Sequence, residues 1–116
     1  MFRRLLAVGP FLALAVACAS PTLPLPPPEQ PVLGPGADAD HITLTVACGG
    51  AEAGALIVIV NTNTTVPGDQ AVSGAIVNSC GGWDATPYAH NGDYLDITQE
   101  IGTEVSQPLV LQVQVP

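Results

Sequence analysis

The chain has 116 residues and is strongly acidic, with ten Asp and Glu against two Lys and Arg and a formal net charge of −8 at pH 7. Both basic residues, Arg3 and Arg4, lie near the N-terminus, so the rest of the chain carries no Lys or Arg. Phosphate binding needs cationic side chains, which excludes nucleic acid and anionic lipid headgroups as partners of that part. Burial, backbone hydrogen bonds and disulfides must therefore hold the fold without ion pairs to Lys or Arg.

The N-terminal segment has the order of charge and hydropathy that is typical of an export signal. Arg3 and Arg4 precede the uncharged apolar run 5–17, and small residues follow it. The run is shorter than the roughly 20 residues that a transmembrane helix needs. The pattern predicts that residues 1–17 are a secretory signal peptide.

The end of this signal carries a processing motif. Leu14-Ala15-Val16-Ala17-Cys18 resembles the lipobox of bacterial lipoproteins. The resemblance implies cleavage before Cys18, a diacylglyceryl thioether on its sulfur and acylation of its amine, so that palmitate-type chains hold the protein in a membrane. Each buried CH₂ contributes ~0.8 kcal/mol to such anchoring. We therefore expect a lipid-anchored protein of the bacterial cell envelope, on the periplasmic or the cell-surface side.

A second interpretation of the same segment stays open. Ala15-Val16-Ala17 and Ala17-Cys18-Ala19 both fit the A-x-A site of the ordinary signal peptidase. Cleavage there would release a secreted, soluble binding protein. Cysteine number favours the lipobox: Cys48 and Cys80 can pair in an oxidising compartment, which leaves Cys18 odd unless it is acylated.

Residues 18–40 are dominated by proline. Pro fixes φ and lacks a backbone donor, so a helix or a central strand is excluded here. The run 26–28 favours the extended polyproline II conformation. We predict a disordered proline-rich linker over 18–40, followed by a folded domain over 41–116. The prolines are Pro21, Pro24, Pro26, Pro27, Pro28, Pro31 and Pro35.

The segment 41–116 has the two-residue apolar periodicity of β-strands and no window of helical periodicity. Strands are predicted over 42–48, 55–60, 71–80, 83–88, 94–101 and 109–115. The continuous apolar run 55–60 predicts a strand buried on both faces or central in a sheet. Asn91-Gly92 predicts a type I′ turn. Five to seven short strands separated by turn residues predict a small all-β sandwich.

Four motifs occur in a fixed order along this domain. The order resembles that of the bacterial immunoglobulin-like (Big-type) repeats of surface proteins, over about residues 41–115. The resemblance implies an immunoglobulin-like β-sandwich that serves as a spacer, stalk or adhesive module without catalytic residues, with a protein or glycan as partner. The motifs are Gly50-Ala51-Glu52-Ala53-Gly54-Ala55-Leu56-Ile57, Gly82-Trp83-Asp84-Ala85, Gly92-Asp93-Tyr94-Leu95-Asp96-Ile97-Thr98-Gln99, and Gly102 with Ser106.

Cys48 and Cys80 each end a predicted strand and are each followed by two glycines. In an up-down-up order the ends of the first and third strands of the domain lie at the same end of the sandwich. This placement predicts a structural disulfide, which would stabilise so small a domain by roughly 3–4 kcal/mol. A redox-active pair usually needs C-x-x-C spacing or a nearby cation, and this part of the chain has neither.

Two groups of acidic residues are candidates for a cation site. Asp93, Asp96 and Glu100, and separately Asp38 and Asp40, could bind Ca²⁺, although no D-x-D-x-D-G loop occurs. We expect solvated surface acids and no cofactor, with a calcium-dependent surface module as an alternative.

Histidines offer the other possibilities. His41 and His90 have no paired spacing typical of a metal site. Ser79, His90 and Asp93 can be named as a hydrolase triad, but no G-x-S-x-G elbow supports them. We therefore expect no enzyme activity.

Two aromatic residues have expected structural roles. Trp83 is predicted to lie in the core with its indole N–H bonded to a carbonyl, with an exposed sugar-stacking role as the alternative. Tyr94, at the start of a late strand, is predicted to form a tyrosine corner.

Overall fold

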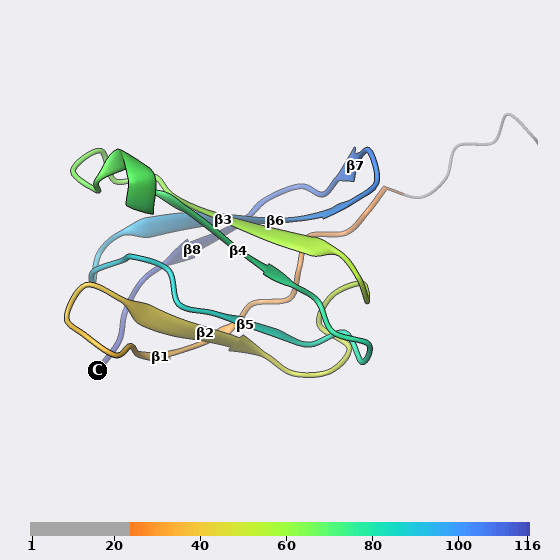
Figure 1. Ribbon diagram of the computed structural model, residues 1–116, viewed down its shortest axis with the longest axis horizontal. Coiled ribbons are helices and arrows are strands. Elements are labelled where there is room, and N and C mark those ends of the chain that lie inside the picture. The colour runs from red at the N-terminus through yellow and green to blue at the C-terminus, as the bar shows by residue number, and fades with distance from the viewer. Residues whose placement is uncertain (1–23) are drawn as a thin grey trace, which may run out of the picture.

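The structure is a computed structural model and describes residues 24–116. The signal segment and Cys18 lie outside these residues. Eight strands form two layers that pack face to face (Figure 1). The prediction of an all-β sandwich is confirmed, with eight strands in place of the expected five to seven.

The smaller layer is an antiparallel sheet of three strands in the order β1-β2-β5. Its strands are β1 (Val32–Pro35), β2 (Ile42–Val46) and β5 (Trp83–Ala85). In β2 the apolar residues of the alternation are buried and the threonines between them face outward. The alternation in sequence therefore determines which face of β2 meets the core.

The larger layer has five strands in the order β4-β3-β6-β7, with β8 also paired to β6. A single turn of 3₁₀ helix, η1 (Gly68–Gln70), leads into β4. All pairings in the layer are antiparallel. The strands are β3 (Leu56–Asn61), β4 (Val72–Ile76), β6 (Tyr94–Ile101), β7 (Glu104–Val105) and β8 (Leu109–Gln112).

The core lies between the layers. It is made of the inward-facing side chains of both sheets, which are every second residue along each strand. Leu44 of β2 meets Ile57 of β3 and Ile97 of β6 in one cluster, and each of the three is 0% exposed. Burial of such a side chain stabilises the fold by about 1.5–3 kcal/mol. The pairing of β2 with β5 in one layer, and of β3, β6 and β8 in the other, matches the B–E and C–F–G neighbours of the immunoglobulin sandwich.

The folded region begins before the predicted boundary at residue 41. β1 lies inside the segment 18–40 that was expected to be a disordered linker, and it pairs with β2 in register Val32↔Thr45. Pro28 and Pro31 are buried. Proline excludes a central strand but is tolerated in an edge strand, because the missing N–H faces no neighbour there. Because of its many prolines, the segment 18–40 was expected to contain no strand, and the edge strand β1 was not predicted.

β3 is central in its layer, as predicted, but it is not buried on both faces. Ile57 and Ile59 face the core, whereas Val58 and Val60 are half-buried and Leu56 is 39% exposed. The outer face of the sheet remains largely uncovered by the described residues. An apolar run therefore identified the strand but not the environment of its outer face.

The Asn91-Gly92 turn also differs from the prediction. Asp93 N–H bonds to His90 O at 3.0 Å, and Gly92 has φ +96° while Asn91 has a negative φ. Type I′ needs positive φ at both central residues, whereas type II needs it at the second alone. The turn connects the two layers and does not close a hairpin, because the strands on its two sides, β5 and β6, belong to different sheets.

Candidate functional site

The sandwich has two ends, for which we use two names. The proximal pole holds the Cys48–Cys80 bridge and the first described residues, and the distal pole holds the β1–β2 turn (36–41), the loop after β3 (61–66) and the segment 86–93. The two poles lie at opposite ends of the antiparallel strands, as Figure 1 shows.

A buried carboxylate organises the distal pole. Asp93 is only 5% exposed and accepts three hydrogen bonds: from Asn61 Nδ2 at 3.0 Å, from Asn63 Nδ2 at 2.7 Å and from the backbone N–H of His90 at 2.9 Å. Asn61 Nδ2 also donates to Tyr88 O at 2.9 Å. These bonds join the end of β3 to the segment before β6, so Asp93 fixes the position of the residues next to it.

The same contacts set the pKa of Asp93. Burial raises this pKa, but the hydrogen bonds from Asn61, Asn63 and the backbone of His90 outweigh burial and hold the pKa below its ordinary value. The carboxylate is therefore ionised at neutral pH. Its role at the pole is structural, because its acceptor positions are directed at the protein itself.

Three aromatic rings lie next to one another on the outside of this pole. His41, directly before β2, forms a bridge with Tyr88, in the segment after β5, and this bridge continues the register of β2 with β5. In a sheet, residues that lie opposite each other share a face, and so do residues two positions apart along one strand. His90 comes two positions after Tyr88 and therefore lies on the same face as His41 and Tyr88. Tyr88 meets the edge of His41 with ring centroids at 5.6 Å and of His90 at 5.2 Å, both T-shaped.

Each histidine of this group is paired with an aspartate. His41 Nδ1 donates to Asp38 Oδ1 at 2.7 Å, and His90 Nε2 donates to Asp40 Oδ1 at 2.9 Å. The hydrogen bond from the His41 ring, with a second from the backbone of Asp40, lowers the pKa of Asp38. Both pairs are largely exposed. We call these five residues, Asp38, Asp40, His41, Tyr88 and His90, the aromatic-acid cluster.

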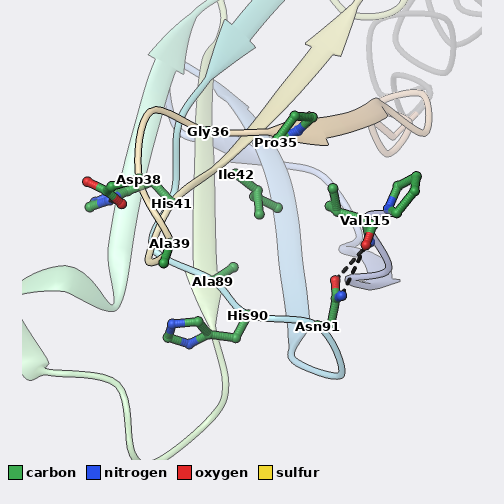
Figure 2. A pocket seen from close by; sticks show the side chains of 11 residues that line it. Pro35, Gly36, Asp38, Ala39, His41, Ile42, Ala89, His90, Asn91 and Val115 are labelled. Atoms are coloured by element: carbon green, nitrogen blue, oxygen red, sulfur yellow. Dashed lines mark hydrogen bonds and ion pairs between the residues drawn. The ribbon is translucent and has the colours of Figure 1, made fainter.

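A depression of about 310 Å³ lies beside the cluster. Figure 2 shows Asp38 and His90 on one side and Val115 on the other. Asn91 closes that far side, donating to Val115 O at 3.0 Å and accepting from Val115 N at 2.8 Å. The lining offers carboxylate, imidazole and backbone groups over an apolar floor that includes Ile42, a chemistry suited to binding hydroxyl or cationic groups.

The predicted calcium residues are not brought together. Asp93 is directed inward to Asn61 and Asn63, while Asp96 and Glu100 lie four residues apart on the outer face of β6. A strand rises about 3.3 Å per residue, which puts positions 96 and 100 roughly 13 Å apart. No group of three His, Cys, Asp or Glu within residues 24–116 is placed to hold a metal ion. The structure therefore does not bring these three candidate calcium ligands together.

The hydrolase residues named from the sequence are not assembled either. Asp93 contacts His90 through the backbone N–H, while the His90 ring is paired with Asp40. Ser79 is exposed beside the Cys80 turn, at the proximal pole. The depression at His90 has no Ser, Thr or Cys in its lining.

The predicted Cys48–Cys80 disulfide is present, with Cα atoms 4.9 Å apart. It joins the loop after β2 to the turn between β4 and β5. Backbone bonds flank it: Gly49 N–H to Cys80 O at 2.8 Å and Ala51 N–H to Gly81 O at 3.0 Å. Gly81 has φ +88°, and a Cβ there would lie 2.8 Å from Ala51 O, so only glycine fits this turn.

Besides the disulfide, the buried side chain of Gln99 holds the proximal pole together. It is 1% exposed, accepts from Glu52 N at 3.0 Å through Oε1 and donates to Pro26 O at 2.7 Å through Nε2. Its backbone N–H donates to Ser106 Oγ at 3.0 Å. Gln99 therefore ties the first described residues and the β2–β3 loop to β6.

The two aromatic residues singled out from the sequence differ in outcome. Trp83 is buried at 4% exposure, but its Nε1 has no hydrogen-bond partner among the described residues, so the expected carbonyl contact is not made. Tyr94 is 49% exposed, and no hydrogen bond of its hydroxyl is found within residues 24–116. The expected tyrosine corner is therefore not formed, because Tyr94 lies on the outer face of β6.

The aromatic-acid cluster was not predicted from the sequence, because most of its members meet only in the folded chain. His41 and Asp38 are three residues apart, which was a usable signal, whereas His90 and Asp40 are fifty residues apart and meet only through strand register. Tyr88 was not singled out.

Within the part of the chain that the structure describes, no helix is long and apolar enough to cross a membrane. Comparison of the whole chain with protein-family models, with curated proteins and with solved structures found no match of any of the three kinds.

Proposed function

We propose that the protein is a bacterial lipoprotein, anchored in the cell envelope through an acylated Cys18, whose immunoglobulin-like sandwich has a non-catalytic structural or adhesive role. The observation that carries the proposal is the lipobox-like sequence 14–18 directly after a signal-like segment. The other features below are consistent with it but do not replace it.

The cysteines support the anchor. Cys48 and Cys80 are consumed by the disulfide, which leaves Cys18 as the odd cysteine of the chain. Disulfides persist in oxidising compartments, which is where an export signal delivers a protein. Acylation of Cys18 accounts for the remaining thiol.

The position of the first described residues supports display of the distal pole. Gln99 holds Pro26 at the proximal pole, so a chain anchored at Cys18 reaches the sandwich at that pole. The distal pole, with the aromatic-acid cluster and its depression, then faces away from the membrane. Its carboxylates and aromatic rings suit a protein or glycan partner that offers cationic groups or hydroxyls.

The deciding experiment is the intact mass of the chain produced in a bacterium with its own signal, next to the variant Cys18→Ser. We expect the native chain in the membrane fraction, beginning at Cys18 with added acyl mass, and the variant without it. Two further thiols should become alkylatable only after reduction. A double variant, Cys48→Ser with Cys80→Ser, serves as control, because it should keep the acyl mass.

A different mass would decide for the alternative. A native chain that begins after Ala17 or Ala19 without acyl mass, and that stays in the soluble fraction, would refute the anchor. The protein would then be a secreted binding protein, and the linker would have no membrane to bridge.

A further inference from the structure

The edge strands of the two layers differ in how they are protected. An unpaired edge attracts other strands unless prolines, charges or short length block it. β1 ends in Pro35, β5 is three residues long and contains Asp84, β7 is two residues long and contains Glu104, and β8 directly follows Pro108. β4 is the longest of the described edge strands, and it contains neither a proline nor a charged residue.

The backbone of β4 has free hydrogen-bonding groups on its outer edge. On either side of β4, Asn61 N–H of β3 donates to Ala71 O at 2.8 Å, and Val77 N–H donates to Ala55 O, directly before β3, at 2.9 Å. Bonded residues alternate along an antiparallel strand, so Ser73 and Ala75 also face β3. The residues that direct their N–H and C=O away from β3 are Val72, Gly74 and Ile76. Such a row of donors and acceptors is completed by another β-strand.

The side chains of β4 fit the same purpose. Val72 is 59% exposed and Ile76 is 66% exposed, and together with Leu56 they form an apolar strip on the outer face of the sheet. β-branched residues are favoured partners across paired strands. An added strand would cover this strip as well as the backbone edge.

We propose that the partner is a second copy of this chain, which pairs β4 with β4 in an antiparallel, two-fold symmetric arrangement centred on Gly74. The three outward-facing residues then meet one another: Val72 lies opposite Ile76 of the second copy, twice, and Gly74 lies opposite Gly74. Ser73 lies opposite Ala75 at the positions where Cα atoms approach to about 4.5 Å, which suits small residues. The strand is thus complementary to itself.

The charge of the chain permits contact at this edge. The described residues carry all ten acidic side chains of the chain and no Lys or Arg, so contacts between acidic surfaces of two copies would bring like charges together. Residues 70–79 contain no charged side chain. Two copies that pair through β4 therefore bring no like charges together along the paired strands.

The symmetry has a consequence that rests on the proposed function. β4 begins near the distal pole and ends near the proximal pole, so antiparallel pairing places the proximal pole of one copy beside the distal pole of the other. Chains anchored through Cys18 in one bilayer present β4 in the same direction. The pairing therefore joins chains anchored in facing membranes, which is an adhesive contact.

The pairing is tested by sedimentation equilibrium of the full chain, in one nonionic detergent with solvent density matched to it, so that acylated and plain chains are compared alike. The native chain should show a reversible monomer–dimer equilibrium. Val72→Lys with Ile76→Lys, and Val72→Glu with Ile76→Glu, should each weaken dimerisation about tenfold or more, because like charges then lie opposite one another. Val72→Lys with Ile76→Glu should restore it to within about threefold of native.

The control is Val110→Lys on β8, at the other edge of the same sheet, since Val110 is 60% exposed and so matches Val72. It should leave the dimer unchanged, and added salt should strengthen the native dimer by screening the acids. A native chain that stays monomeric at millimolar concentration overturns the proposal. So does a dimer that Val110→Lys abolishes, or one that the opposite-charge variant fails to restore.

The adhesive consequence has its own readout. Vesicles that carry the acylated chain should cluster, and vesicles with the double-lysine variant should not. Dimers in solution without clustering would refute the facing-membrane arrangement and leave the strand pairing intact. A chain without acyl groups would refute the proposed anchor, while sedimentation would still decide the pairing.

Discussion

The two poles of the sandwich are held together by different chemistry. At the proximal pole a covalent bridge, Cys48–Cys80, and the buried amide of Gln99 fasten three loops to the sheets. At the distal pole a buried carboxylate, Asp93, does so through hydrogen bonds alone. The proximal pole therefore depends on redox conditions and the distal pole on pH.

The largest effect should come from breaking the bridge. Cys48→Ala with Cys80→Ala should lower the free energy of unfolding by roughly 3–4 kcal/mol, because the bridge closes a loop of sequence separation 32. The melting temperature should fall by about 12–30 °C. Thermal unfolding followed by circular dichroism measures it, with Cys18→Ser as the control that retains the bridge. An unchanged melt would show that the bridge contributes nothing to the proximal pole.

Next in size is the loss of charge at Asp93. Asp93→Asn should cost about 2–3 kcal/mol at pH 7, since it replaces an acceptor of three charge-assisted bonds with a group that also donates. Because the pKa of Asp93 is lowered in the folded state, its contribution is present above the unfolded value of about 3.9 and is lost as pH falls through the folded pKa.

Urea unfolding at pH 7 and at about pH 3 tests both parts of this prediction. The difference between native and Asp93→Asn should shrink at the lower pH. Asp69→Asn, on exposed η1, is the matched control and should differ little from native at either pH. An equal difference at both pH values would contradict the role of the carboxylate charge.

A smaller loss should follow from removing the amide of Gln99. Gln99→Ala should cost about 1–3 kcal/mol, since each of its two side-chain bonds contributes about 0.5–1.5 kcal/mol. The amide hydrogen of Glu29, which donates to Gly50 O at 2.9 Å in the segment that Gln99 holds, should exchange faster, while those near Asp93 should not. Exposed Gln112 provides the control as Gln112→Ala. Unchanged exchange at Glu29 would mean that Gln99 does not hold the first described residues.

The smallest effect on stability should come from the exposed pairs of the distal pole. His41→Gln with His90→Gln should change the free energy of unfolding by only about 0–1 kcal/mol, because exposed ion pairs gain little. Chemical denaturation at pH 6 and 7 measures the change. A loss comparable to that of Asp93→Asn would assign the aromatic-acid cluster a role in folding and remove it as a free binding surface.

Much of the fold could be predicted from local pattern. Alternation in 42–46 and 94–97 placed the apolar residues of β2 and β6 on the core side, as observed. The disulfide was predicted because Cys48 and Cys80 each lie at the end of a predicted strand. Sequence alternation did not predict the residues that lie in an environment unusual for their type. β1 contains a proline. On β6 the polar Gln99 is buried, whereas the apolar Ile101, two residues further along the strand, is 40% exposed.

What the sequence by itself determined is the class of the fold, the inward face of its main strands and the disulfide, because these depend on residues within one strand or at its end. Which strands are neighbours, and therefore the meeting of His90 with Asp40 and the exposed edge of β4, was decided only by the tertiary structure. Strand register brings together residues far apart in the chain, and no local periodicity carries that information.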